Sequence, residues 1–375
     1  MSSQSDYTSR AQRITTRFPL LTFLSIQIVF WIFANLLLAL MMYFHAQAIS
    51  VTYQIKAMVS FVPILLVSLI MGIFYGLSLG FLDFYLRKGL LKKKSFARLL
   101  LLKTIISFFI LTLIVLLLHS VFYDSFKPVF SNAARMPVPA AWNSFYLALG
   151  IYYFFMTLLI SFINQMNRRY GPGVLVPLLL GRYRNPREEE RIFLFMDLKS
   201  STSIAEQLGH LKYSAFIRDA FSDISQDIAA YNAQIYQYVG DEIVLTWHTS
   251  EGSRNFCCIR FFFACEKRLR ARSQYYRQHY GWVPEFKAGV HEGKVTAVEI
   301  GEIKLEVAYH GDTINTTARI QSVCNHYGKT LLVSETLLQK LTVPGEGFES
   351  EPLGAIQLKG KTENITIYSV QKTIS

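Results

Sequence analysis

The sequence predicts two parts: an α-helical membrane domain of four transmembrane helices, followed by an α+β domain whose helices pack on a mostly antiparallel sheet. Two observations support this division. The 375 residues are 51% hydrophobic and only 17% charged, and the apolar excess lies almost wholly before residue 165. After residue 181 charged residues concentrate, and short strand-like runs alternate with helical ones.

Four apolar stretches are each long enough to cross a bilayer as a helix, which takes about 20 residues. They form a membrane domain at 20–165, after a tail at 1–19, and they run Leu20–Tyr43, Met58–Leu82, Leu99–Phe122 and Trp142–Ile163. The strongly polar exceptions inside them are Asn35 and Lys103. Asn35 can bond a neighbouring helix, and Lys103, near a span end, can reach the interface.

Basic residues gather on one side of the predicted spans, which indicates the cytoplasmic side. The tail, the second connection and the segment after the fourth span are basic, whereas the other two connections hold only Lys56, Lys127 and Arg135. We therefore predict an integral protein of the cell membrane with its N-terminus and its C-terminal domain in the cytoplasm. Cleavage after Ala46-Gln47-Ala48 is an alternative that leaves the C-terminal domain on the same side.

The net charge of +12 is explained by these flanks. We expect no nucleic-acid partner, because no run of basic and aromatic residues resembles a nucleic-acid groove. The four cysteines contain no CxxC pair, so they fit neither a zinc site nor a disulfide framework, and we interpret them as reduced thiols.

A connector at 166–190 leads to the second domain, at 191–372. We expect strands in this domain at Ile192–Met196, Ile235–Val239, Ile243–Trp247, Phe286–His291, Val295–Ile300, Thr330–Val333 and Ile365–Val370. Helices are expected from the capping box Ser203–Glu206 to Tyr231, and at Arg254–Tyr280 and Thr313–Asn325. Gly240-Asp241 signals a hairpin, and Glu292–Lys294 is expected to separate two strands.

Two carboxylates lie where predicted strands end. Asp197 closes the first strand, and Asp241 lies at the tip of the hairpin. If the strands are neighbours, the pair can hold Mg²⁺ or Mn²⁺, which favour oxygen ligands and suit phosphoryl chemistry. The turn after Asp197, with Ser200, Ser201 and Thr202, runs into a helix N-terminus that can receive phosphates. Taken alone, either aspartate is better explained as a turn residue or cap.

A third element is the stretch Gly311–Arg319 (GDTINTTAR). Asn315 and Arg319 are four residues apart, so on a helix they share a face. An amide and a guanidinium together can orient a ribose and stabilise charge on a phosphate in transfer. The alternative for a lone arginine is an exposed helix charge.

These elements together resemble the class III adenylate and guanylate cyclase family, of the bacterial type with a four-helix membrane anchor. The resemblance covers roughly Arg191–Val370 and rests on FMDLKSST at 195–202, YVGDE at 238–242, FKAGVHEG at 286–293, the stretch 311–319, and LKGK at 358–361. It implies a ferredoxin-like, palm-type sheet flanked by helices. It further implies that ATP or GTP is converted to a 3′,5′-cyclic nucleotide and pyrophosphate with two metal ions per site.

The resemblance also implies roles for single residues. Asp197, Asp241 and the backbone carbonyl of Leu198 would be metal ligands, Asn315 would orient the ribose, and Arg319 would stabilise the transition state. Lys359 or Lys361 would meet the triphosphate. Since family members place the aspartates and the Asn–Arg pair on different subunits, the resemblance implies a homodimer with two equivalent sites.

Two positions depart from the family's patterns. Adenine-selective members usually carry Lys where this chain has Gln237, and Asp or Thr where it has Ala308; the usual guanine-selective pattern is absent as well. The amide of Gln237 both donates and accepts, so it can bond either base. The choice between ATP and GTP stays open, and ATP is favoured on family frequency.

Three other functions remain alternatives. A catalytically silent nucleotide-binding domain would explain the unusual base positions, but the metal, Asn and Arg positions are retained. A transporter with a regulatory tail would need more polar spans. A diguanylate cyclase would carry a Gly-Gly-Asp-Glu-Phe hairpin, where this chain has Val239-Gly240-Asp241-Glu242-Ile243.

Overall fold

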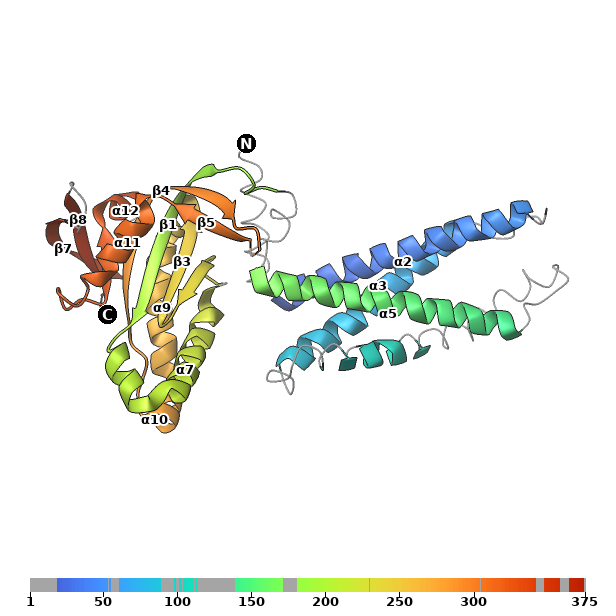
Figure 1. The fold of residues 1–375 in the computed structure, drawn as a ribbon, viewed down its shortest axis with the longest axis horizontal. Coiled ribbons are helices and arrows are strands. Elements are labelled where there is room, and N and C mark those ends of the chain that lie inside the picture. Colours follow the sequence, from blue (N-terminus) through green and yellow to red (C-terminus); the bar gives the residue numbers. More distant parts are fainter. Residues whose placement is uncertain are drawn as a thin grey trace. The chain divides into compact units, whose positions relative to one another are not determined.

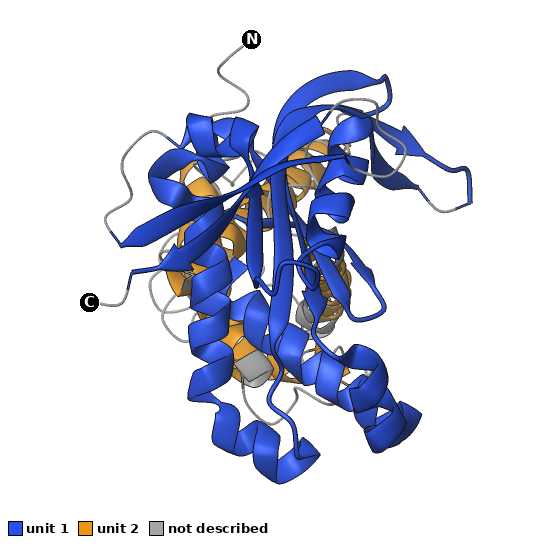
Figure 2. Ribbon diagram, turned by 90° about the vertical axis from the view of Figure 1, so that its left-hand side faces the viewer, with its two compact units in different colours: residues 1–17, 171–375 blue, residues 18–170 orange. Residues whose placement is uncertain are grey.

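The computed structural model comprises two compact units, a helical unit at Phe18–Tyr170 and a second unit that includes Gly171–Ser375 (Figures 1 and 2). The structure describes residues 19–52, 54, 61–88, 98, 101–102, 104–110, 112–113, 139–170, 181–228, 230–303, 305–341, 347–357 and 364–373.

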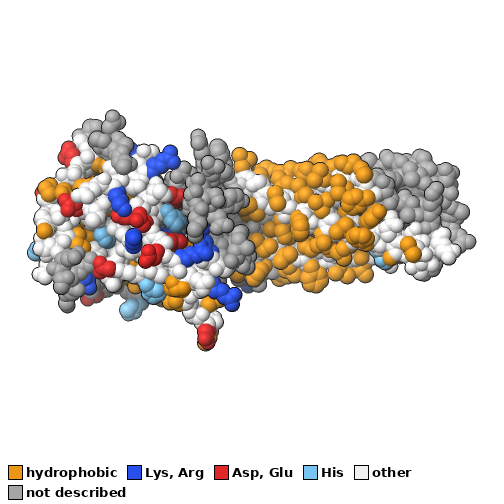
Figure 3. Space-filling model, turned by 90° about the horizontal axis from the view of Figure 1, so that it is seen from above, with side chains coloured by type: hydrophobic (Ala, Val, Ile, Leu, Met, Phe, Trp, Pro, Cys, Tyr) orange, Lys and Arg blue, Asp and Glu red, His pale blue; other side chains and the backbone are white. Residues whose placement is uncertain are grey.

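Long apolar helices form the first unit. They are α2 (Pro19–Thr52), α3 (Phe61–Lys88) and α5 (Pro139–Tyr170). Each contains a stretch long and apolar enough to cross a membrane. Figure 3 shows hydrophobic side chains over the visible face of this unit, where a soluble protein would carry charges.

The structure supports three of the four predicted spans. Of the expected span Leu99–Phe122, residues 104–110 are helical, whereas Lys103 and most of the remaining span lie outside the described residues. Asn35 behaves as expected, since the Tyr153 hydroxyl of α5 donates to its side-chain oxygen. Gln27 is a further polar residue inside the unit, 3% exposed, which the sequence interpretation overlooked.

The second unit is built on one eight-stranded sheet, so the predicted α+β class is confirmed. Its strand order is β2-β3-β1-β4-β6-β8-β7, with β5 paired to the far end of β4. The pairs are antiparallel apart from β4 with β6. The strands are β1 (Arg187–Leu198), β2 (Gln234–Val239), β3 (Glu242–His248), β4 (Phe286–Ile300), β5 (Glu306–His310), β6 (Leu331–Ser334), β7 (Phe348–Gln357) and β8 (Asn364–Lys372).

Helices cover both faces of this sheet (Figure 1). On one face, α7 (Ser201–Ile228), α9 (Cys257–Ala271) and α10 (Ser273–Tyr280) enclose the main core, which includes Leu194, Leu245 and Val290. On the other face lie α11 (Asp312–Ser322) and a smaller cluster around Phe193 and Val244. Because side chains alternate along β1, Asp197 shares this second face with Phe193 and Phe195.

The prediction of two strands separated by Glu292–Lys294 is wrong, because β4 runs unbroken over fifteen residues. Its glycines serve close packing, not a turn. A Cβ at Gly289 would lie 2.4 Å from the backbone nitrogen of Gln321, and one at Gly293 would lie 2.5 Å from Thr313 Oγ1. Both contacts belong to α11, so the glycines let this helix lie directly on the strand.

The single helix expected at Arg254–Tyr280 is also wrong, because the chain breaks twice. Asn255 and Phe256 adopt positive φ angles, and Arg272 leaves the helical region between α9 and α10. Short helices complete this unit, α8 (Thr249–Gly252) and α12 (Glu335–Lys340), with a 3₁₀ turn at Arg254–Phe256. Strand β1 begins at Arg187, inside the expected connector, and β5 and β7 were not predicted.

Candidate active site

Asp197 and Asp241 are brought together by strand pairing. Asp197 near the end of β1 pairs with Glu242 at the start of β3, and Asp241 precedes Glu242 in the hairpin turn. Gly240 supplies the positive φ of 61° that the turn requires. The predicted juxtaposition of the two carboxylates is thus present at one end of the sheet.

These acidic groups destabilise one another. Burial, followed by the charge of Asp241, raises the pKa of Asp197 above its usual range. Burial, Asp197 and Asp241 together raise the pKa of Glu242 to about 7. Negative charge concentrated in this way is relieved by a bound cation.

Two side chains that the sequence interpretation did not single out contact Asp197. Lys287, opposite Asp197 on β4, places Nζ 3.3 Å from Asp197 Oδ2. Gln321, on α11, donates from Nε2 to the same oxygen at 3.2 Å. Lys287 lies within the FKAGVHEG stretch, but contact across the sheet depends on strand register, which spacing alone does not specify.

The donor set fits a divalent ion. Among the described residues no group of three or more His, Cys, Asp or Glu side chains forms a ready metal site. Mg²⁺ does not need one, because it usually binds one or two carboxylates and fills its remaining positions with water and substrate phosphate oxygens. Asp197 and Asp241 would hold such an ion, and the buried Leu198 carries the expected carbonyl.

The turn that follows Asp197 leads into α7, which is kinked at Gly209. Ser200 has a positive φ of 54°, its carbonyl accepts from the backbone N–H of Ile204, and α7 begins at Ser201. Ser201 is partly buried and Thr202 exposed, so the first turn of α7 is open to a ligand. Burial, followed by the charge of Asp241, raises the pKa of Tyr213 to about 12.

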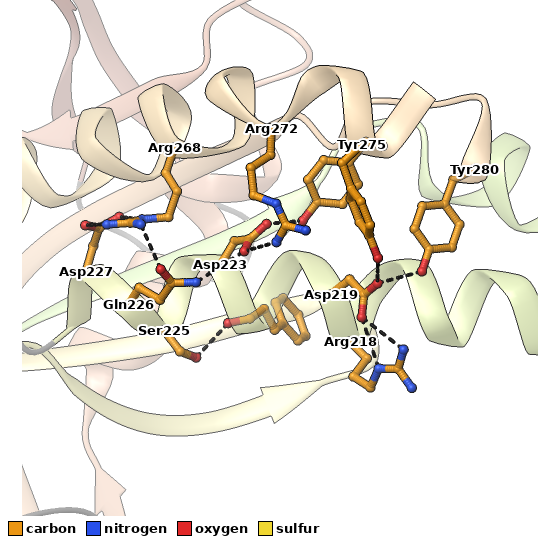
Figure 4. A network of polar contacts seen from close by, with 12 residues as sticks. Arg218, Asp219, Asp223, Ser225, Gln226, Asp227, Arg268, Arg272, Tyr275 and Tyr280 are labelled. Atoms are coloured by element: carbon orange, nitrogen blue, oxygen red, sulfur yellow. Dashed lines mark hydrogen bonds and ion pairs between the residues drawn. The ribbon is translucent and has the colours of Figure 1, made fainter. Parts of the chain in front are cut away.

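A ladder of carboxylates fixes α7 against α9 and α10 (Figure 4). Asp219 accepts from Tyr275 and Tyr280, and Asp223 accepts from Arg272 and Tyr276. Asp227 accepts two hydrogen bonds of 2.6 Å from Arg268. These acids are engaged in structural contacts, and they anchor the part of α7 that follows the kink at Gly209.

Asn315 and Arg319 lie on the accessible side of α11, with Asn315 exposed and Arg319 half-buried. Within the described part of the chain, no hydrogen bond or ion pair joins either of them to Asp197 or Asp241. The carboxylates at the sheet end and the amide and guanidinium on α11 thus form two separate groups, each a candidate half-site.

The remaining predicted residues divide into two groups. Gln237 is exposed on β2 just after a bulge, whereas Ala308 on β5 is buried. Their neighbours Tyr236 and Tyr309 touch, with ring centroids 5.1 Å apart. Lys359 and Lys361 lie outside the described residues, between the paired ends of β7 and β8.

The family model of the adenylate and guanylate cyclase catalytic domain matches residues 184–372. This chain belongs to that cyclase family. Adenylate cyclase 2 of Rhizobium meliloti (strain 1021) is 36% identical over 211 residues, 56% of this chain and 58% of that protein. An adenylate cyclase of Anabaena cylindrica is 24% identical over 184 residues, 48% of this chain and 36% of that one. This chain thus spans less than two thirds of the length of either relative.

Solved cyclase structures are similar to the second unit. A bacterial light-regulated adenylyl cyclase aligns with a TM-score of 0.49 and 20% identity over 57% of this chain and 64% of its own. The adenylyl cyclase CyaB from P. aeruginosa aligns with a TM-score of 0.44 and 17% identity, over 51% and 97% respectively.

Proposed function

We propose that this cyclase is a membrane-anchored enzyme that converts ATP into 3′,5′-cyclic AMP and pyrophosphate at two equivalent sites of a homodimer. The observation that carries the proposal is the split site, with Asp197 and Asp241 at the sheet end and Asn315 and Arg319 on the open side of α11. Each half carries groups suited to one task in the reaction, and two copies would complete both sites.

In this proposal the ribose 3′-oxygen attacks the α-phosphorus, and the bond to the departing pyrophosphate breaks. Two divalent ions, when bound, would stabilise the attacking and leaving oxygens. Asp197, Asp241 and the Leu198 carbonyl hold the ions. Ser200, Ser201 and Thr202 at the N-terminus of α7 receive phosphate oxygens.

The partner subunit would supply the other groups. The partner's Asn315 orients the ribose, and the partner's Arg319 stabilises the charge that develops at the α-phosphate. Lys359 or Lys361 meets the triphosphate as a point charge. The proton of the 3′-hydroxyl passes to solvent.

Exposed apolar side chains support the homodimer. They lie on β2 and on the hairpin of β4 and β5, and comprise Ile235, Tyr238, Val239, Ile300, Ile303 and Leu305. Ile303 is fully exposed, which is unfavourable for a large aliphatic side chain unless another surface covers it.

The choice of ATP rests on the adenylate cyclases of Rhizobium meliloti and Anabaena cylindrica. Guanylate cyclases of mammals also match, at 22% identity for the rat protein, so cyclic GMP from GTP is the second candidate. The exposed side-chain amide of Gln237 can hydrogen-bond either adenine or guanine, since it both donates and accepts. We further propose that the chain lies in the cell membrane with its N-terminus and catalytic unit in the cytoplasm, as its basic flanks indicate.

The test uses the full chain, purified in detergent and supplied with ATP or GTP and Mn²⁺, with both cyclic products quantified. We expect cyclic AMP to dominate and Asp241→Asn to lower its rate at least a hundredfold while the fold persists. A folded, dimeric wild-type protein that makes neither product would contradict the proposed enzymatic activity. A catalytically silent nucleotide-binding domain would then be the better interpretation. Dominant cyclic GMP would overturn only the substrate.

A further inference from the structure

Gln321 belongs to α11 but serves the opposite half-site. The open side of this helix carries Asn315 and Arg319, whereas the Gln321 side chain points inward and is only 7% exposed. Its Nε2 donates to Asp197 Oδ2 at 3.2 Å. One hydrogen bond therefore connects the helix that presents the guanidinium to the carboxylate that would hold metal.

Close packing holds α11 on the sheet beside this bond. At Gly289 the approach of the Gln321 backbone leaves no room for a Cβ. Eight residues earlier on α11, Thr313 Oγ1 donates to the Lys294 carbonyl at 2.7 Å. These contacts anchor α11, which carries Arg319, to β4 at both ends.

Asp197 has a second partner that does not belong to α11. Lys287 contacts the same oxygen, Oδ2, at 3.3 Å, but it lies on β4 within the sheet. Losing the Lys287 contact changes the charge around Asp197 and its neighbour Glu242, and it removes no bond to α11. Losing the Gln321 contact removes a hydrogen bond between Asp197 and α11, so the two partners form a matched pair of probes.

We propose that Gln321 is a positioning residue that couples the two sites of the dimer. The inference rests on the proposed function, since in a shared-site dimer Asp197 and Arg319 of one chain act in different sites. Fixing Asp197 in one site then holds α11, and through it the Arg319 that reaches into the other site.

The first test needs no catalysis. Mn²⁺ binding to the full chain without nucleotide is measured by the electron paramagnetic resonance of the free ion. Gln321→Met keeps the length of the side chain but cannot donate, and we expect it to weaken Mn²⁺ binding about tenfold, as loss of an outer partner of a ligand does. Thr316→Val is the control, because the buried Thr316 hydroxyl donates to Asp312 within α11.

The second test separates local from transmitted effects. A heterodimer of Asp241→Ala and Arg319→Ala chains keeps one working site, with metal carboxylates from the Arg319→Ala chain and Arg319 from the Asp241→Ala chain. Gln321→Met is then placed on either chain. On the Asp241→Ala chain its Asp197 belongs to the dead site, so a slower rate must arrive through α11.

We expect Gln321→Met to lower the rate from both positions, and Lys287→Met only when it lies on the chain with the working carboxylates. Unchanged Mn²⁺ affinity, or a Gln321→Met effect confined to the working carboxylates, would overturn the coupling. If the heterodimer without these changes is inactive, the shared site of the proposed function fails instead. Equal losses of melting temperature in Gln321→Met and Thr316→Val with wild-type binding would show a packing role only.

Discussion

Arg191 lies in β1 with 1% of its side chain exposed, although a buried guanidinium is costly. Its Nε donates to Glu189 Oε2 at 2.7 Å, Nη1 donates to Gln234 Oε1 at 3.0 Å, and the guanidinium lies 4.7 Å from the ring centroid of Tyr309. These contacts satisfy its charge where the chain enters the catalytic unit.

Removing one member of this pair should cost more than removing both. We expect Arg191→Met to lower the free energy of unfolding of the catalytic unit by about 3–5 kcal/mol, because the Glu189 side chain then loses its close partner and keeps Arg182, 3.8 Å away. The double variant with Glu189→Gln should recover part of that loss. Urea denaturation measures both, and a double variant less stable than Arg191→Met would contradict the explanation.

His248 in the same cluster predicts a pH dependence. Burial and the Arg191 guanidinium lower the pKa of His248 to about 4, with Glu189 opposing and Arg182 assisting. Because the folded pKa lies below the unfolded value of about 6.5, this group's contribution to stability is present above pH 6.5 and lost as the pH falls towards 4. The His248→Asn variant should reduce the change in melting temperature between pH 6.5 and pH 4. An unchanged pH profile of the melting temperature would contradict this role of His248.

At the scale of elements, α11 and β4 act as one assembly. The Gly289→Ala variant should displace α11, because the new Cβ would lie 2.4 Å from the Gln321 nitrogen and 2.8 Å from its Cα. We expect the free energy of unfolding to fall by about 1–3 kcal/mol. The cyclase rate should fall by more than this loss of stability alone would cause. Gly150→Ala is the control, since its Cβ would meet Phe108 at an ordinary 3.5 Å. Wild-type activity in Gly289→Ala would contradict the close fit.

The elements also show how far a sequence specifies this fold. The hairpin at Asp241 follows from local chemistry, since Gly-Asp between two apolar runs admits few other structures, and it was predicted correctly. The unbroken β4 was missed because Gly293 resembles a turn residue, whereas its role depends on Thr313, twenty residues away. No Gly or Pro marks the break at Arg272 in the sequence. The Arg272 guanidinium instead bonds Asp223 on another helix, a contact that depends on how the helices pack.

The candidate site was predictable in the same measure. Asp197, Asp241, Asn315 and Arg319 follow from motif spacing, and the structure supports the proximity of the two aspartates. Lys287 and Gln321 could not be found that way, because their contacts with Asp197 depend on strand register and helix packing. Gln237 and Ala308 leave the base undetermined in the structure as in the sequence.

For the whole molecule, the proposed catalysis requires a second copy that completes the two half-sites. The complementing experiment mixes equal amounts of the full chain carrying Asp197→Ala with the full chain carrying Arg319→Ala, each inactive alone. Mixed dimers keep one intact site, so random pairing should restore about one quarter of the wild-type rate. A mixture that forms heterodimers and stays as inactive as either variant would contradict the shared site.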